Sequence, residues 1–186
     1  IEKAFSRIGE KVIISNDKSI ISKADKLVIP GVGHFKFGMK NLEKNMLKKT
    51  ILKKINVDKI PVLGICLGMQ LMTAFSEEGN INGLGLIDLR VDRIKSDKLK
   101  IPHMGWNTVE SKQDLRLFKG IDNKETFYFV HSYCINEQNN RYKCGYTNYA
   151  SKFISTYEEN NIFGVQFHPE KSHDQGLQLI SNFRDI

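Results

Sequence analysis

The chain lacks several features that mark particular classes of protein. It contains no run of about 18 apolar residues, so we expect no membrane-spanning helix and no membrane partner. Residues 1–5 carry neither the apolar segment nor the cleavage motif of a signal peptide. Only three cysteines are present, Cys66, Cys134 and Cys144, and this odd number argues against a framework of disulfides. We therefore expect a protein of the reducing cytoplasm.

Arginine is also scarce, although the chain is basic. Lysine and arginine number 28 against 21 acidic residues, which gives a net charge of +7, but only six of the 28 are arginine. Proteins that bind specific nucleic acids favour the bidentate guanidinium group of arginine. The lysines are instead scattered among isoleucine and asparagine, as on a solvated surface. We therefore expect no nucleic-acid partner, since net charge alone indicates only non-specific binding.

The first half of the sequence alternates apolar strands with helices. The chain has 186 residues without an internal repeat, a low-complexity tract or a linker, which predicts one domain over residues 1–186. The alternation favours an α/β fold with a mostly parallel sheet. We predict helices at residues 2–8, around Leu42, Met46 and Leu52, and from Cys66 onward, and strands at residues 11–15, 26–30 and 60–65.

The second half carries short strands separated by turn residues. Such closely spaced strands readily form hairpins, so we expect them to extend the sheet in antiparallel fashion. The predicted strands are residues 84–89, 126–130, 142–146, 153–157 and 162–167, and a helix at residues 176–183 follows them.

The strongest local signal is Gly64-Ile65-Cys66-Leu67-Gly68, which directly follows an apolar strand and precedes a helical pattern. This is the thiol form of the nucleophile elbow, in which a sharp turn lifts the reactive side chain out of the sheet. The flanking glycines permit the strained backbone and its close neighbours. The backbone N–H of Leu67 is then available to stabilise an oxyanion. The alternative is a buried structural cysteine between two packing glycines.

A cysteine nucleophile needs a base, and His168 is the histidine best placed to supply it. His168 follows the strand at residues 162–167. Because the loops after the strands of an open α/β sheet share one edge, His168 can meet Cys66 although the two are far apart in sequence. Glu170 can hold the second imidazole nitrogen, as the third member of a triad does.

The remaining histidines do not indicate a metal site. We interpret His34, His103 and His173 as structural residues. His168 and His173 could form a metal-binding pair, but Cys134 and Cys144 lack the spacing that would complete a zinc site. We therefore expect neither a metal nor a cofactor.

Two glycines, Gly31 and Gly33, follow the strand at residues 26–30, at the same edge of the sheet. Their backbone N–H groups are unshielded and free to rotate, which suits a second oxyanion donor. A glycine turn after a strand is common, so this signal is weak on its own.

Five segments together resemble the class I (triad) glutamine amidotransferases. They are PGVGHF, GICLGMQL, IPHMGWN, FYFVHSY and IFGVQFHPEKS, and the resemblance covers essentially the whole chain. It is strongest to the glutaminase subunits of imidazole glycerol phosphate synthase, an enzyme of histidine biosynthesis. It implies a flavodoxin-like, three-layer α/β fold whose sheet is mixed, mostly parallel, with antiparallel additions. Because members of the family open with a strand that this sequence lacks, we expect an N-terminally truncated domain.

The resemblance also implies a role for each segment. Cys66 would attack the side-chain amide of glutamine, His168 would transfer protons, and Glu170 would orient His168. The other implied residues are Gly31, Val32, Gly33, Leu67, Gln70, Glu78, His131, Ser132 and Tyr133 at the glutamine site, and Met104, Gly105, Trp106 and Asn107 at a partner interface.

The implied partner is a (β/α)8-barrel cyclase, which would use the ammonia to form imidazole glycerol phosphate and aminoimidazole carboxamide ribotide. Two alternatives remain open. A paralogous glutaminase of surface-polysaccharide sugar synthesis would share every catalytic residue, and a non-catalytic scaffold subunit would keep only the fold. At the level of single residues, Gln70 and Glu78 could be polar residues of a helix surface, and Trp106 could pack in the core.

Overall fold

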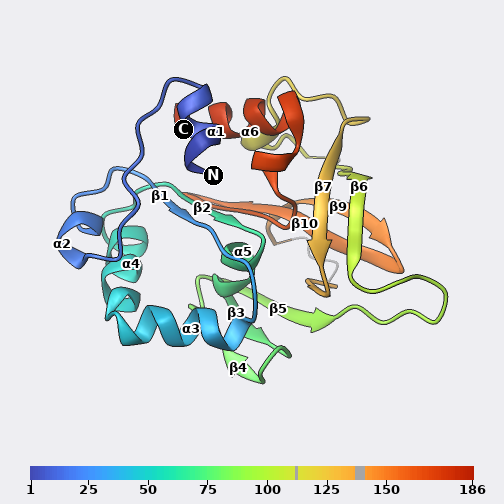
Figure 1. Cartoon of the computed structure of the whole chain (residues 1–186), viewed down its shortest axis with the longest axis horizontal. Helices are drawn as coiled ribbons and strands as arrows, with labels where there is room; N and C mark the ends of the chain where they lie inside the picture. The colour runs from blue at the N-terminus through green and yellow to red at the C-terminus, as the bar shows by residue number, and fades with distance from the viewer. Residues whose placement is uncertain (112, 137–140) are drawn as a thin grey trace.

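The centre of the fold is a five-stranded sheet with parallel strands at one side and antiparallel strands at the other (Figure 1). The computed structural model of the chain describes residues 1–111, 113–136 and 141–186. The strands lie in the order β1 (Leu27–Ile29), β2 (Val62–Ile65), β11 (Ile162–Val165), β10 (Ser151–Glu159) and β9 (Lys143–Tyr149). The first three are parallel neighbours, and β10 and β9 continue the sheet in antiparallel fashion.

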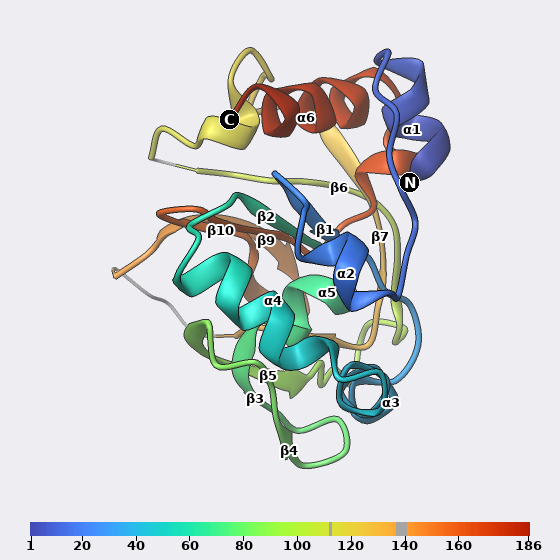
Figure 2. The same ribbon diagram turned by 90° about the vertical axis from the view of Figure 1, so that its left-hand side faces the viewer.

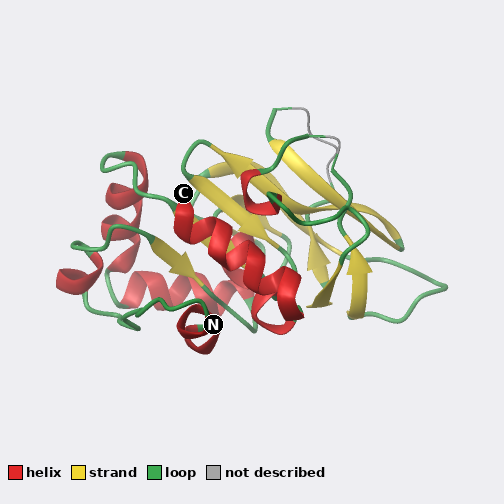
Figure 3. Cartoon of the chain, turned by 90° about the horizontal axis from the view of Figure 1, so that it is seen from above, coloured by secondary structure: helices red, strands yellow, loops and turns green. Residues whose placement is uncertain are grey.

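Helices cover both faces of this sheet, which makes three layers (Figure 2). One face carries α1 (Glu2–Arg7) and α6 (His173–Asp185), and Figure 3 shows α6 lying across the strands. The other face carries α2 (Lys18–Ile21), α3 (Phe35–Lys44), α4 (Leu47–Asn56) and α5 (Leu67–Leu71). No helix of the described residues is both long and apolar enough to cross a membrane.

The core is divided between these two faces. Successive side chains of a strand point to opposite sides of a sheet. Accordingly, Val62 of β2 packs in one apolar cluster with Met39 of α3, while its neighbour Leu63 packs in the other cluster with Phe183 of α6. The central strands are therefore buried on both sides, as parallel strands of α/β proteins are.

In the described part of the chain, two smaller sheets lie beside the main one. The first has the order β4 (Ile81–Asn82), β3 (Thr73–Ser76), β5 (Ile87–Arg93) and β8 (Tyr133–Cys134). The second is a two-stranded antiparallel ribbon of β6 (His103–Thr108) and β7 (Thr126–His131). Two 3-10 helices, η1 (Arg116–Phe118) and η2 (Pro169–Lys171), lie in the connections.

The predicted α/β class with antiparallel additions is confirmed. The strands expected at residues 26–30, 60–65, 126–130, 142–146, 153–157 and 162–167 are present within a few residues of their predicted limits, as are the first and last helices. Because β9, β10 and β11 follow one another closely in the chain, they pair as antiparallel neighbours in the way the hairpin-prone sequence predicts.

Three local predictions are wrong. Residues 11–15 form no strand, and Ile13 and Ile14 are 74% and 77% exposed, because no strand in the described part of the chain joins this segment to the outer edge of β1. The helix predicted around Leu42, Met46 and Leu52 is broken into α3 and α4, since Met46 adopts a left-handed φ of +52°. The strand predicted at residues 84–89 begins only at Ile87 and continues to Arg93.

Candidate active site

Cys66 stands at the turn between β2 and α5, as the nucleophile elbow predicts. Figure 1 shows these two elements following each other at the centre of the fold. Its φ of +53° and ψ of −110° lie in a region that residues other than glycine seldom adopt. A Cβ atom at Gly64 would lie 2.7 Å from the backbone nitrogen of Met69, and one at Gly68 would lie 1.7 Å from the carbonyl oxygen of Ile29. Both flanking positions therefore require glycine, because a side chain there would collide with backbone.

His168 reaches the same edge of the sheet from the neighbouring strand. β11 runs parallel to β2 with Val165 opposite Ile65, so the residues that follow the two strands lie next to each other. The Nδ1 atom of His168 lies 2.9 Å from Oε1 of Glu170, within hydrogen-bond distance. His168 is 2% exposed. The structure thus brings together the three residues that the sequence nominates as nucleophile, base and orienting carboxylate.

The electrostatic environment holds His168 in its charged form. Burial by itself would lower the pKa of His168, but interactions with the sulfur of Cys66 and with the carboxylate of Glu170 outweigh it and raise that pKa to about 9. Burial opposes ionisation of Glu170 too, yet the hydrogen bond and charge of His168 lower the pKa of Glu170 overall. The Nε2 atom of His168 is buried and has no hydrogen-bond partner among the described residues.

A cavity of about 320 Å³ opens beside the sulfur of Cys66. Eight of the residues predicted at the glutamine site line it together with Cys66, and Val130 is the one lining residue that the sequence does not nominate; the eight are Val32, Gly33, Leu67, Gln70, Glu78, His131, Ser132 and Tyr133. Gly31 is the one residue predicted at the glutamine site that does not line this cavity. It contacts the site through its backbone instead.

Gln70 is buried in the wall of this cavity rather than displayed on a helix surface. Its Nε2 atom donates hydrogen bonds to the carbonyl oxygen of Tyr133 at 2.9 Å and to Oε1 of Gln166 at 2.8 Å. The amide nitrogen of Gln166 in turn lies 3.7 Å from the sulfur of Cys66. Gln166 is therefore a site residue that the sequence analysis missed, and its position two residues before His168 was the available signal.

Glu78 is also tied to the site by its carboxylate. Its Oε2 atom accepts a hydrogen bond from the backbone N–H of Phe35, at 2.7 Å. That N–H belongs to the first turn of α3, where backbone donors lack partners within the helix. Glu78 thus connects α3 to the wall of the cavity, where a carboxylate is suited to bind a substrate ammonium group.

The backbone donor next to the nucleophile is already occupied. The N–H of Leu67 donates a hydrogen bond to the carbonyl oxygen of Gly31, at 3.3 Å. In a trans peptide the carbonyl oxygen and the following N–H point in opposite directions. The N–H of Val32 therefore points away from that of Leu67, and the two donors do not converge on one oxyanion position in this conformation.

The segment predicted to contact a partner forms the edge strand β6. Two of its large apolar side chains are exposed, Met104 at 62% and Trp106 at 46%, so Trp106 is not a core residue. The ring of Trp106 stacks on that of His173, with 4.8 Å between the ring centroids and 6° between the ring planes. Gly105 has a φ of +134°, and a Cβ atom there would meet nothing within 4 Å. The side chain of Asn107, by contrast, is engaged within the protein.

The other two cysteines lie in settings that suppress reactivity. Burial raises the pKa of Cys134 to about 12, with a further contribution from Asp92, and burial likewise raises the pKa of Cys144 to about 12. Both thiols therefore remain protonated at neutral pH, and a protonated thiol is a poor nucleophile.

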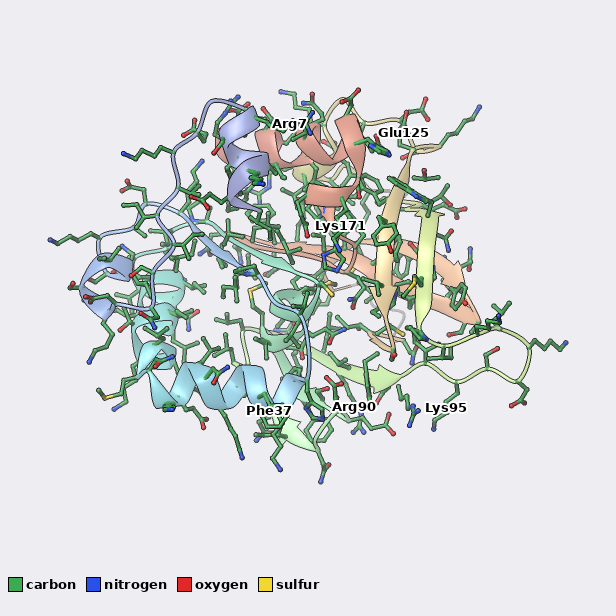
Figure 4. The ribbon with its side chains drawn as sticks, in the orientation of Figure 1. Arg7, Phe37, Arg90, Lys95, Glu125 and Lys171 are labelled. Atoms are coloured by element: carbon green, nitrogen blue, oxygen red, sulfur yellow. The ribbon has the colours of Figure 1, made fainter. Side chains whose placement is uncertain are left out.

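A second cavity, of about 380 Å³, shares no lining residue with the first. It lies along β5, near the edge of the molecule where Figure 4 labels Arg90 and Lys95. Its lining is charged and polar and contains no cysteine or histidine. Although it is the larger of the two, it holds no cysteine thiol with an adjacent histidine, so we assign the chemistry to the cavity beside Cys66.

Comparison with known proteins gives the family. The sequence model of the family "Glutamine amidotransferase class-I" matches residues 1–185. The chain belongs to the class I glutamine amidotransferases. It is 46% identical over 184 residues to the imidazole glycerol phosphate synthase subunit HisH 2 of Methanococcus maripaludis, covering 98% of this chain and 91% of that one. It is 43% identical over 185 residues to subunit HisH 1 of Campylobacter jejuni, covering 98% and 92%.

Solved structures of other proteins share the fold. A structure titled "Crystal structure of glutamine amidotransferase" has a TM-score of 0.76 at 14% identity and covers 98% of this chain and 92% of its own. The glutaminase domain of Trypanosoma brucei CTPS with bound acivicin has a TM-score of 0.67 at 16% identity, covering 99% and 85%. At such identities the likeness concerns the fold alone.

Proposed function

We propose that this amidotransferase is the glutaminase subunit of an imidazole glycerol phosphate synthase, with residues 1–186 forming one glutaminase domain in the cytoplasm. It hydrolyses L-glutamine to glutamate and passes the ammonia to a (β/α)8-barrel cyclase. The cyclase uses the ammonia to form imidazole glycerol phosphate and aminoimidazole carboxamide ribotide. The observation that carries the glutaminase activity is the strained Cys66 beside the ion pair of His168 and Glu170, at a cavity lined by Gln70 and Glu78. The 46% identity to a HisH subunit supports the cyclase as the partner.

The reaction proceeds through a thioester on Cys66. The thiolate attacks the side-chain amide carbon of glutamine, and the imidazolium of His168 gives its proton to the leaving nitrogen, so that ammonia departs. Water then attacks the thioester while His168 removes a proton from it, which releases glutamate and regenerates the thiolate. The raised pKa of His168, about 9, supports the first step because it keeps the proton on the ring at neutral pH. All atoms of the products, glutamate and ammonia, come from glutamine and water.

The resting conformation is consistent with a glutaminase that is silent until its partner binds. An oxyanion needs convergent donors, and the N–H of Leu67 is held by the carbonyl oxygen of Gly31. Rotation of the peptide between Gly31 and Val32 would remove that oxygen and turn the N–H of Val32 toward the site. Val32 is 80% exposed, and a Cβ atom at Gly33 would meet nothing within 4 Å, so the segment has room to rotate.

Strand β6 is the surface that we assign to the cyclase. Exposed apolar side chains such as Met104 and Trp106 are typical of the core of a protein interface. Gly105, between them, lets a partner backbone approach closely. Lys171 of η2 lies over the ring of Tyr128 on the adjacent strand, 5.6 Å from Nζ to the ring centroid, and adds a positive charge beside this face (Figure 4).

One alternative function rests on a specific observation. Methanococcus maripaludis has two proteins named HisH, and each is 46% identical to this chain. Overall identity therefore does not distinguish between paralogues that serve different synthases. The alternative is a glutaminase that supplies ammonia to an amidotransferase of surface-polysaccharide sugar synthesis.

The test is reconstitution with the cyclase encoded in the same genome. The complex should form imidazole glycerol phosphate from either glutamine or free ammonia. The Cys66→Ala variant of the complex should lose the glutamine-dependent reaction and keep the ammonia-dependent one, because ammonia bypasses the glutaminase. If the cyclase neither binds this chain nor gains glutamine-dependent activity from it, while the chain remains a glutaminase with another synthase, the paralogue function is correct.

A further inference from the structure

A buried pair of histidines adjoins the glutamine cavity and has no part in the mechanism above. His103, the first residue of β6, lies opposite His131, the last residue of β7. Nδ1 of His103 is 2.9 Å from Nε2 of His131, and the two residues are 2% and 7% exposed. The ring of His103 stacks on that of Tyr149, with 3.9 Å between centroids. The pair is therefore shielded from water and packed among aromatic rings.

The hydrogen bonds that the two rings make to their other neighbours determine which nitrogen of each histidine carries the proton. Nδ1 of His131 is 2.8 Å from the carbonyl oxygen of Tyr133, and because a carbonyl only accepts, this nitrogen carries the proton. Burial lowers the pKa of His131 to about 3, so the ring is neutral and its Nε2 is an acceptor. It follows that Nδ1 of His103 donates to it.

The contacts of His103 on the side away from His131 show independently that its proton lies on Nδ1. The Nε2 atom of His103 lies 3.3 Å from Nδ2 of Asn107. The orientation of this amide is fixed, since Nδ2 also donates to the carbonyl oxygen of Asn148 at 3.1 Å, and Oδ1 accepts from the N–H of Thr108 at 2.9 Å. Nε2 of His103 is therefore an acceptor, and its proton lies on Nδ1. Burial lowers the pKa of His103 to about 4, which keeps that ring neutral too.

On the side of His131, this series of hydrogen bonds reaches the glutamine cavity. The carbonyl oxygen of Tyr133, which accepts from His131, also accepts from Nε2 of Gln70 at 2.9 Å. Gln70, His131 and Tyr133 all line the cavity beside Cys66. A continuous, one-directional series of hydrogen bonds thus runs from Asn107 on β6, through both histidines, to the wall of the substrate site.

We propose that His103 is a positioning residue for glutamine binding. By donating to His131, it holds the ring that fixes the Tyr133 carbonyl, and that carbonyl in turn orients Gln70. The inference rests on the proposed glutaminase function, since the cavity must bind glutamine for the position of its wall to matter. His103 touches neither Cys66 nor the base, so its loss should affect the binding of glutamine more than the chemical steps.

The test compares three substitutions of His103 in the complex with its cyclase. His103→Phe keeps the aromatic stacking but removes both hydrogen bonds, and leaves Nε2 of His131 without a donor. KM for glutamine should rise about 5- to 150-fold, the range expected for one buried polar group left unsatisfied, with a smaller change in kcat. The His103→Asn variant should have a KM close to that of the wild type. The amide nitrogen of asparagine is bonded to Cγ, as Nδ1 of histidine is, and can therefore donate to Nε2 of His131. The His103→Gln variant should keep the raised KM, since its amide lies one bond further out.

Tyr149→Phe is the matched control. It keeps the ring stacked on His103 and removes only a hydroxyl that donates to the carbonyl oxygen of Lys100, outside the series, so KM should not change. Equal KM values for wild type and His103→Phe, or equal defects in the Asn and Gln variants, would overturn the positioning role. If the wild-type complex hydrolyses no glutamine, the proposed function fails instead.

A second measurement uses only the wild-type chain, so it requires neither glutaminase activity nor correctly folded variants. Nitrogen-15 chemical shifts of the imidazole rings in the wild-type chain distinguish the two neutral tautomers. Both His103 and His131 should carry their proton on Nδ1 at neutral pH. A proton on Nε2 of either ring would break the series of hydrogen bonds and contradict the inference.

Discussion

The carbonyl oxygen of Gly31 accepts a hydrogen bond from the backbone N–H of Leu67, at 3.3 Å. This places an oxygen where an oxyanion hole needs a donor, immediately after the nucleophile Cys66. The same trans peptide directs the N–H of Val32 away from the site. The three residues that we propose for catalysis lie together, but the donors that would stabilise a tetrahedral intermediate do not converge.

Binding of the partner should therefore raise turnover. Removing one oxyanion donor from an enzyme costs about 10²–10³-fold in kcat, so a misdirected N–H is sufficient to silence the isolated subunit. We expect the cyclase with its ligand to increase glutamine hydrolysis by at least about 10²-fold, mainly in kcat rather than in KM. Steady-state glutaminase kinetics with and without the partner measure this. Full activity of the isolated subunit would contradict the gated oxyanion hole.

Val32→Pro should abolish the stimulation by the partner, because proline has no backbone N–H to turn into the site. We expect the turnover of the stimulated complex to fall by about 10²–10³-fold. Val32→Ala, which keeps the N–H, is the control and should be stimulated like the wild type. The measurement is kcat of each variant in the loaded complex, after confirming that both still bind the cyclase. Stimulation of the proline variant to the wild-type level would show that another group supplies the second donor.

Removal of the base should cost more than removal of its orienting carboxylate. Loss of a positioned proton-transfer group typically lowers the rate by about 10²–10⁴-fold, and we expect a loss in this range for His168→Ala. Glu170→Gln should be milder, since the imidazole remains present although less well oriented. Both are measured as kcat of the glutaminase reaction in the complex. A larger defect in Glu170→Gln than in His168→Ala would reverse the assigned roles.

The pKa of His168 should fall when its partners are removed. Burial alone lowers this pKa, and interactions with Cys66 and Glu170 raise it to about 9, so Cys66→Ala and Glu170→Gln should each titrate at a lower pH than the wild type. Titration of the ring by NMR measures the shift. For a base whose pKa rises on folding from about 6.5, the stabilising contribution is complete below pH 6.5 and is lost as the pH rises through 9. A pKa unchanged in both variants would contradict the ion pair.

The sequence was sufficient to predict the parts of the site that depend on local backbone requirements. Gly64 and Gly68 around Cys66 are needed because backbone atoms approach where a side chain would be, and such positions leave a recognisable pattern. His168 could be placed because parallel strands share an edge. The apolar runs of β2 and β11 likewise indicated buried strands, since both faces of the central sheet are covered.

Contacts between distant segments could not be predicted where no shared sheet edge brings the segments together. Residues 11–15 have the composition of a strand, but a strand also needs a paired neighbour, and the sequence does not state whether one is present. Strand β6 was not predicted, although its segment was nominated as an interface. His103 was interpreted as a structural residue, because nothing in its sequence context shows that its ring meets His131, the Asn107 amide and, through them, the cavity.

The most direct test of the central claim is the site at which a glutamine-like electrophile reacts. We propose incubating the chain, in complex with its cyclase, with a glutamine analogue that carries an electrophile in place of the side-chain amide, and locating the adduct by peptide mass spectrometry. One adduct should form on Cys66, glutaminase activity should disappear in proportion to labelling, and Cys134 and Cys144 should remain unmodified because their pKa values of about 12 keep them protonated. An adduct on another residue, or glutaminase activity that survives full labelling of Cys66, would contradict the account.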